Sequence, residues 1–110
     1  MSRDARAIVL ELLAARNDRS APRAAELLHA DVEYWDPEHD DVRGRDAVAE
    51  LLTSRAARLE LETLAAQDGD AVAEVQVDEG RGPFRSTEVY RLEDGAVTAL
   101  RAYFVPAVRS

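Results

Sequence analysis

The 110-residue chain contains no cysteine and no lysine. The first absence excludes disulfide bonds, thiolate catalysis and cysteine metal ligands, and the second excludes a lysine Schiff base. Long apolar runs are also missing, because Glu11 interrupts the run Ile8–Leu10 at once. We therefore find neither a signal peptide nor a membrane span, and a cytoplasmic protein is expected. A glycine-rich phosphate loop and a dinucleotide-binding fingerprint are absent too.

Acidic residues outnumber basic ones by 22 to 14, which gives a net charge of −8. Such a surface repels nucleic acids and anionic membranes, so we expect neither as a partner. The chain is 46% apolar and 33% charged, as is usual for a globular protein. At this length it can bury one hydrophobic core, so residues 1–110 are interpreted as a single domain.

Three helices are predicted in the N-terminal half. The first has apolar residues four apart on one face and ends at Asn17-Asp18. Ser20 is a suitable N-cap for a second, shorter helix that ends near His29. A third helix is expected from about Asp46 to Arg58.

The remaining pattern is typical of β-strands. Val32–Asp36 is rich in β-forming residues and stops at Pro37, and a polar loop follows from Glu38 to Gly44. After the third helix, apolar and polar residues alternate over 59–62, 71–77, 84–92 and 96–105. Asp94-Gly95 predicts a tight hairpin turn between the last two strands. This order predicts an α+β fold in which helices pack on one side of a curved, mostly antiparallel sheet.

One face of the predicted strand 84–92 is mostly apolar but carries the carboxylate of Glu88. The residues on this face are Phe84, Ser86, Glu88, Tyr90 and Leu92. A buried carboxyl with no cation beside it has a raised pKa and can act as an acid at neutral pH. Alternatively, Glu88 pairs with an arginine across the sheet or reaches the rim.

Several segments resemble SnoaL-like proteins of the nuclear transport factor 2-like superfamily. The first half contains Leu-Leu-x-x-Asp-Val over 27–32, Asp-Pro at 36–37 and Arg-Gly-Arg over 43–45. The second half matches over 90–97 and 100–104. The resemblance implies a cone-shaped α+β fold with three N-terminal helices, which encloses a small apolar pocket and forms a homodimer through the outer sheet face. The superfamily includes isomerases, cyclases, hydrolases, dehydratases and binding proteins, so the resemblance is less specific for activity.

Ketosteroid isomerase, one member of this superfamily, suggests roles for two carboxylates. By this resemblance Asp36 is the general base, and Glu88 is a neutral acid that stabilises an oxyanion. Leu12 stands where the isomerase has an oxyanion-hole tyrosine, and Tyr34 or Tyr90 are candidates to replace it. The alternative for Asp36 is structural, since an aspartate before a proline commonly organises a turn.

The predicted ligand-binding residues are Leu12, Tyr34, His39, Tyr90, Ala102 and Phe104. His39 is either a titrating group near the pocket mouth or a solvated loop residue. The acidic loop 36–41 fits no standard metal-ligand spacing, so we expect a solvated loop and no metal. If Leu100, Ala102 and Phe104 line the pocket, Arg101 and Tyr103 face a neighbouring subunit.

Three functions are consistent with these residues. The first is a cofactor-independent isomerase or cyclase that acts by acid–base chemistry on a small apolar carbonyl compound. The second is a protein that binds such a compound without turnover. The third is a dimeric scaffold with a vestigial pocket. An epoxide hydrolase is not favoured, because no convincing Asp-Arg-Asp set is present, and no serine has the context of a nucleophile.

Overall fold

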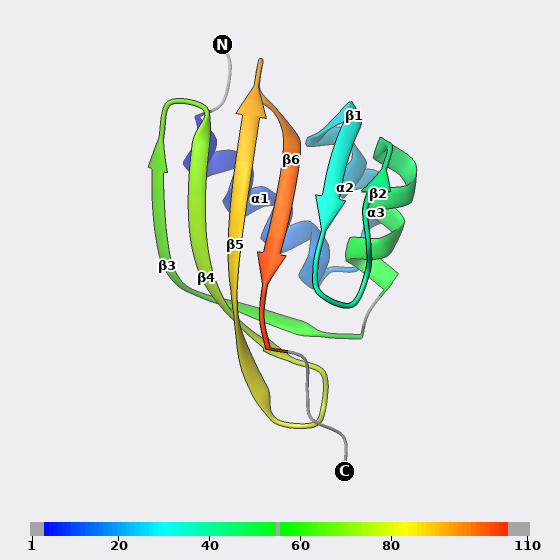
Figure 1. Ribbon diagram of the computed structural model, residues 1–110, viewed down its shortest axis with the longest axis vertical. Helices are drawn as coiled ribbons and strands as arrows, with labels where there is room; N and C mark the ends of the chain where they lie inside the picture. The colour runs from blue at the N-terminus through cyan, green and yellow to red at the C-terminus, as the bar shows by residue number, and fades with distance from the viewer. Residues whose placement is uncertain (1–3, 55, 106–110) are drawn as a thin grey trace.

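Helices cover one face of a six-stranded sheet in the computed structural model of the protein (Figure 1). The structure describes residues 4–54 and 56–105. The elements are α1 (Ala5–Asn17), α2 (Ala21–Glu26), β1 (Leu28–Trp35), β2 (Val42–Arg43), α3 (Arg45–Ser54), β3 (Arg58–Gln67), β4 (Asp70–Asp78), β5 (Pro83–Glu93) and β6 (Ala96–Tyr103). The strand order is β2-β1-β6-β5-β4-β3. Only β1 and β6 pair in parallel among these strands, so the predicted α+β fold with a mostly antiparallel sheet is confirmed.

Helix α1 lies across the inner face of the sheet and is fixed at both ends. Asp4 caps it, because its carboxylate accepts a hydrogen bond of 2.8 Å from the amide of Ala7. At the other end, the Asn17 side chain accepts from the amide of Leu59 at 2.7 Å and donates to its carbonyl at 2.9 Å. These two bonds join the last turn of α1 to the first residues of β3, and thereby position Arg16 over the sheet.

The second helix is shorter than the sequence predicts. It ends at Glu26, and Leu28 and His29 already belong to β1, whose predicted start was Val32. Leu28 pairs with Val97 of β6, and the amide of Val97 donates to the carbonyl of Leu27 at 2.9 Å. This long-range pairing outweighs the local helical pattern, which is a common outcome for short helices.

Two further boundaries differ from the prediction. Val42 and Arg43 were expected in a loop but form β2, because Arg43 pairs with Glu33 and Val42 with Tyr34 of β1. Helix α3 ends at Ser54 instead of Arg58, which begins β3.

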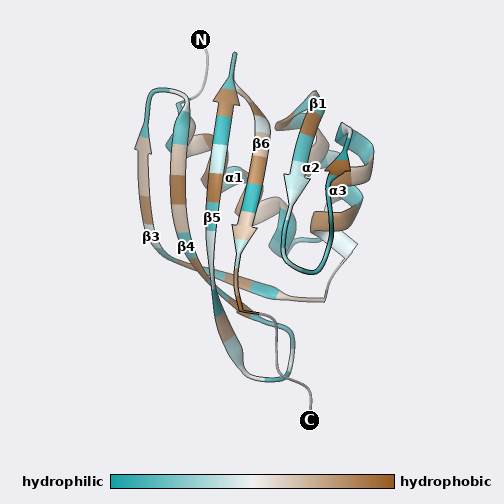
Figure 2. Ribbon diagram, viewed as in Figure 1, coloured by the Kyte–Doolittle hydropathy of each residue, from teal (hydrophilic) through white to brown (hydrophobic). Residues whose placement is uncertain are grey.

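The last two strands follow the prediction closely. Alternate residues of β5 are buried between Ser86 and Leu92. Figure 2 shows that both hydrophilic and hydrophobic residues occur along this strand. The turn between β5 and β6 has positive φ angles of 52° at Asp94 and 77° at Gly95. Two successive left-handed residues are the signature of a tight hairpin turn, so the hairpin prediction is confirmed.

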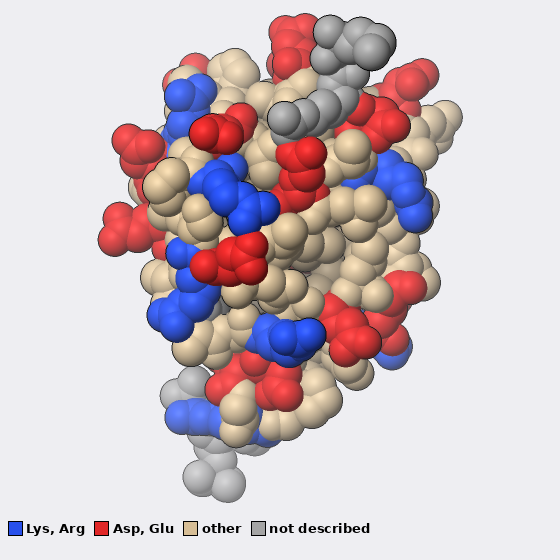
Figure 3. All heavy atoms as spheres, turned by 180° about the vertical axis from the view of Figure 1, so that it is seen from behind, with Lys and Arg blue, Asp and Glu red and all other residues tan. Residues whose placement is uncertain are grey.

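Acidic and basic side chains are intermingled over the helical side of the molecule (Figure 3). Several acidic groups have arginine partners at the surface, such as Glu62 with Arg85 and Asp18 with Arg23. Within the described ranges, no helix is long and apolar enough to cross a membrane.

Candidate functional site

A cavity lies between the helices and the inner face of the sheet. Its volume is about 40 Å³, and it is open to solvent. Most of its lining is apolar: Leu52, Ala57, Leu59, Val77, Phe84, Ala102 and Phe104. The rings of Phe84 and Phe104 pack at 5.4 Å between centroids. Four polar residues complete the lining: Arg16, Tyr34, Ser86 and Glu88. The cavity wall therefore combines mostly apolar residues with a few polar groups.

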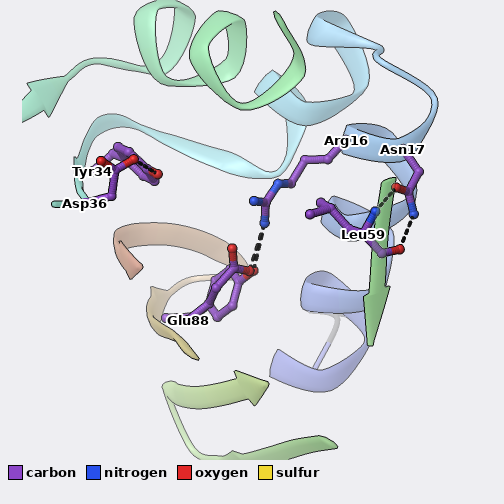
Figure 4. A network of polar contacts seen from close by, with 7 residues as sticks. Arg16, Asn17, Tyr34, Asp36, Leu59 and Glu88 are labelled. Carbon is purple, nitrogen blue, oxygen red and sulfur yellow. Dashed lines mark hydrogen bonds and ion pairs between the residues drawn. The ribbon is translucent and has the colours of Figure 1, made fainter. Parts of the chain in front are cut away.

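Glu88 is the centre of a buried polar cluster on the cavity wall (Figure 4). Its side chain is 2% exposed, and that of Arg16 is 10% exposed. Arg16 Nη1 donates to Glu88 Oε1 at 2.8 Å, and the Tyr90 hydroxyl donates to the same oxygen at 2.5 Å. Glu88 Oε2 accepts no hydrogen bond from the part of the chain that the structure describes. One oxygen of the carboxylate is thus held in place, and the other is available to a ligand.

The burial of Glu88 was predicted correctly, but the assumption of a carboxyl without a cation was wrong. The alternative of an arginine partner is correct, although this arginine comes from α1 and not from a neighbouring strand. Sequence reasoning missed Arg16 because the two residues are 72 positions apart. A signal was present, since Arg16 stands four residues after Leu12 and so continues the buried face of the helix.

Electrostatics fix the protonation states of Arg16 and Tyr90 in this cluster. Burial lowers the pKa of Arg16, but the nearby Glu88 carboxylate and the Tyr90 hydroxyl outweigh burial and raise it overall. Burial and the charge of Glu88 raise the pKa of Tyr90 well above its usual range. Arg16 is therefore a permanent cation, and Tyr90 is a neutral donor at physiological pH.

Asp36 lies in a second buried cluster at the end of β1. The hydroxyl of Tyr34 donates to Asp36 Oδ2 at 2.5 Å. The amides of Glu38 and His39 donate to Oδ1 at 2.7 and 2.6 Å, and His39 Nδ1 is 3.1 Å from both oxygens. Asp36 therefore organises the turn that follows it, which was the structural alternative for this residue.

The hydrogen bonds of this turn also set the charge of Asp36. Burial raises its pKa, but the hydrogen bonds from Tyr34, from the amides of His39 and Glu38, and from the His39 ring lower it overall. Burial and the hydrogen bond to Asp36 raise the pKa of Tyr34 above its usual range. Asp36 is ionised and borders the cavity only through Tyr34, since Tyr34 lines the cavity and Asp36 does not.

The structure brings together only part of the predicted ligand site. Glu88, Tyr34, Ala102 and Phe104 line the cavity. Three other candidates do not line it: Leu12, Tyr90 and His39. Leu12 is fully buried in the core, Tyr90 supports Glu88, and the His39 side chain is 33% exposed beside Asp36. The ligand-binding and catalytic roles of all these residues stay predictions.

The acidic loop after Asp36 does not form a recognisable metal centre. In residues 4–54 and 56–105, no three side chains of the His, Asp or Glu type are grouped to hold a metal ion. The carboxylate of Asp36 is instead engaged by protein donors.

Comparison with solved structures shows which fold this is. A protein of nuclear transport factor 2-like type from Cytophaga hutchinsonii, of unknown function, has a TM-score of 0.84 at 21% identity, covering 92% of this chain and 89% of that one. A protein described as a candidate ketosteroid isomerase from Kribbella flavida has a TM-score of 0.84 at 21% sequence identity. The match covers 96% of this chain and 80% of that one. The epoxide hydrolase/cyclase-like enzyme SalBIII is described in connection with pyran ring formation in the polyether salinomycin. It has a TM-score of 0.79 at 16% sequence identity, and the match covers 92% of this chain and 90% of that one.

These likenesses establish the nuclear transport factor 2-like fold that the sequence predicted, with a curved sheet that does not close. The comparison with curated proteins gave no match. The family comparison matches residues 9–100, which is most of the chain, to the SnoaL-like domain. The chain therefore belongs to the SnoaL-like domain family, whose nuclear transport factor 2-like fold also occurs in isomerase-like and cyclase-like proteins.

Proposed function

We propose that this protein binds a small, mostly apolar carbonyl compound and isomerises or cyclises it by acid–base chemistry without a cofactor. The observation that carries the proposal is a cavity lined mostly by apolar residues, in which the buried pair Arg16 and Glu88 are the only charged residues among those that the structure describes. Buried ionisable groups are costly, and they gather at functional sites more often than elsewhere. The similarity to isomerase-like and cyclase-like proteins supports the same class of reaction.

In this reaction Glu88 is the proton carrier. Its free oxygen, Oε2, takes a proton from the carbon beside the ligand's carbonyl group. The electron pair of that C–H bond forms a C=C bond to the carbonyl carbon, and the carbonyl π pair moves to the oxygen to form an enolate. In a β,γ-unsaturated ligand this enolate is conjugated with the second C=C bond, so its γ-carbon takes the proton back from Glu88, the carbonyl re-forms, and no proton or electron is lost.

Arg16 and Asp36 have supporting roles in the proposal. Arg16 is a buried cation beside Glu88, and its positive charge stabilises the enolate oxygen as it forms. Asp36 acts through Tyr34, whose hydroxyl it holds at 2.5 Å on the cavity wall. The prediction that Asp36 itself is the general base competes with this assignment, and the Asp36→Asn and Glu88→Gln variants distinguish the two.

Proton abstraction can be measured without knowing the natural substrate. The probe is 2-acetylnaphthalene in D₂O, and proton NMR follows the loss of its methyl signal as deuterium enters. We expect the protein to accelerate exchange over buffer, and Glu88→Gln to abolish the acceleration. Glu93→Gln is the matched control, since Glu93 is an exposed residue on the same strand. Exchange no faster than in buffer would contradict the catalytic proposal.

A binding protein without turnover is the second candidate, and a specific observation favours it. One oxygen of Glu88 already accepts from two donors. Asp36 has donors on both oxygens, and these hydrogen bonds lower its pKa, so it is a weaker base than a free carboxylate. A ligand that raises the melting temperature without any exchange would identify this function. If no compound in a panel of steroids, phenols and aromatic ketones raises it, the vestigial-pocket scaffold is favoured instead.

We also propose that the outer face of the sheet forms a homodimer interface. Val72, Val89 and Tyr103 are 42%, 38% and 45% exposed there, and Trp35 packs on Tyr103 with ring centroids 5.4 Å apart. Val72 and Val89 are directly opposed on β4 and β5, and Arg101 lies between Val89 and Trp35 in the register of β5, β6 and β1. Light scattering after gel filtration tests this. A wild-type mass of about 12.1 kDa at tens of micromolar would contradict it, and Val89→Glu should convert a dimer to a monomer.

A further inference from the structure

Two buried polar groups beside Glu88 make no hydrogen bond. Arg16 Nε and Ser86 Oγ are the buried side-chain atoms without a partner over the described ranges. Ser86 is only 2% exposed, and both residues line the cavity. Native proteins seldom leave such groups unpaired, so each calls for an explanation. A ligand that enters the cavity is one source of the missing acceptor.

The charge of the cavity wall limits which acceptor fits. Among the lining residues in 4–54 and 56–105, Arg16 and Glu88 are the only charged ones, and they neutralise each other. Tyr34 and Ser86 are neutral. An anionic or cationic ligand would therefore bring an unbalanced charge into a buried site, where ions are far more costly than in water.

We propose that Ser86 and Arg16 form a subsite that binds an uncharged oxygen of the ligand and discriminates against ionic analogues. The Ser86 hydroxyl and the Arg16 guanidinium donate hydrogen bonds to this oxygen, and the apolar body of the ligand packs on Phe84, Phe104 and their neighbours. This inference rests on the proposed function and adds to it the residue that determines specificity and the charge of the substrate class.

The position of Ser86 fits the reaction as well as the binding. Ser86 and Glu88 are two residues apart on β5, so their side chains lie side by side on the inner face of the sheet. An oxygen held by Ser86 and Arg16 places the neighbouring carbon of a ketone toward Glu88. Ser86 is accordingly a positioning residue for the proton transfer.

Four ligands with the same ring system test the selection of charge. They are 2-acetylnaphthalene, the apolar 2-isopropylnaphthalene, the anion 2-naphthoate and the cation (2-naphthylmethyl)ammonium, each titrated at pH 7 by isothermal calorimetry. We expect the ketone to bind about threefold to tenfold more tightly than the apolar analogue, as one additional hydrogen bond provides. Both ions should bind at least about tenfold more weakly than the ketone.

The variant Ser86→Ala tests the residue, with Ser54→Ala as its control because Ser54 is exposed on α3 and outside the cavity lining. Ser86→Ala should bind the ketone about threefold to tenfold more weakly and the apolar analogue unchanged. Its melting temperature without ligand should not fall, since the hydroxyl has no partner to lose. A purely structural Ser86 would lower the melting temperature and leave the ratio of the two affinities unchanged.

The outcomes separate this inference from the proposed function. If an ion binds as tightly as the ketone, or Ser86→Ala keeps the preference for the ketone, the subsite is wrong and the apolar-ligand pocket still stands. If none of the four compounds binds, the proposed function fails together with the inference.

Discussion

The molecule buries two carboxylates, and it satisfies them in opposite ways. Asp36 is 2% exposed and Glu88 is 1% exposed. The hydrogen-bond donors to Asp36 in the described part of the chain lie within three residues of it in the sequence, from Tyr34 to His39. Glu88 depends on Arg16, 72 residues away, and on Tyr90. The first carboxylate organises a turn, and the second joins a helix to the middle of the sheet.

This difference indicates which of the two carboxylates a ligand can contact. Both oxygens of Asp36 are engaged by protein donors, so a ligand would have to displace a local hydrogen bond. Glu88 lines the cavity and keeps one oxygen that has no donor among residues 4–54 and 56–105. A buried group whose bonds are left incomplete by the fold is the better candidate for binding, because the ligand supplies what the protein lacks.

The largest expected effect comes from removing the cation of the Glu88 cluster. Arg16→Met leaves a buried carboxylate without its partner, which typically costs about 3–5 kcal/mol in the free energy of unfolding. Urea denaturation at pH 7 measures this loss. The double variant Arg16→Met with Glu88→Gln should recover most of it, because neither charge then remains.

A surface pair provides the control for that prediction. Arg23 and Asp18 are 2.6 Å apart, with side chains 52% and 62% exposed. Arg23→Met should cost less than about 1 kcal/mol, since exposed ion pairs contribute little. If Arg16→Met costs no more than Arg23→Met, the Glu88 cluster is not a structural centre and the comparison fails.

Substitution of the two tyrosines should have effects of intermediate size on the free energy of unfolding, and these effects should differ between the two clusters. Tyr90→Phe removes one of the two donors to Glu88, and we expect a loss of about 1–3 kcal/mol in the free energy of unfolding. Tyr34→Phe should cost less, because Asp36 keeps its amide and imidazole donors. Chemical denaturation of both variants gives the order, and a larger loss for Tyr34→Phe would reverse the assignment of the more dependent carboxylate.

The smallest effect is a pH dependence that belongs to Asp36. Its pKa is lower in the folded protein than its usual value of 3.8, so the ionised form stabilises the fold above that pH. This contribution is lost as the pH falls below 3.8 through the lower pKa of the folded state. Asp36→Asn should cost about 1 kcal/mol at pH 7 and progressively less in acid. Thermal melts of both proteins between pH 7 and pH 2.5 test this, and parallel curves would contradict it.

The sequence predicts those features that depend on local pattern. Period-two alternation correctly placed Glu88 on the buried face of β5, and Asp94-Gly95 correctly placed the hairpin. The turn at Asp36 was foreseen as an alternative because Pro37 follows it directly. In each case the decisive interactions lie within a few residues, where spacing and turn chemistry are informative.

Features that depend on distant pairing were missed. The early start of β1 at Leu28 needs β6, and the short strand β2 needs Glu33 and Tyr34 as partners. Arg16 was missed for the same reason, since only the crossing of α1 over the sheet brings it to Glu88. The unpaired hydroxyl of Ser86 becomes visible only when every neighbour is known.

The most direct test of the account is a carbon-detected NMR titration of the side-chain carboxyls with 2-acetylnaphthalene. The variants Glu88→Gln and Asp36→Asn assign the two signals. Because Glu88 lines the cavity and Asp36 reaches it only through Tyr34, we predict that the Glu88 signal moves most and that the Asp36 signal moves less. A titration in which Asp36 moves and Glu88 does not would contradict the placement of the ligand site on the Glu88 cluster.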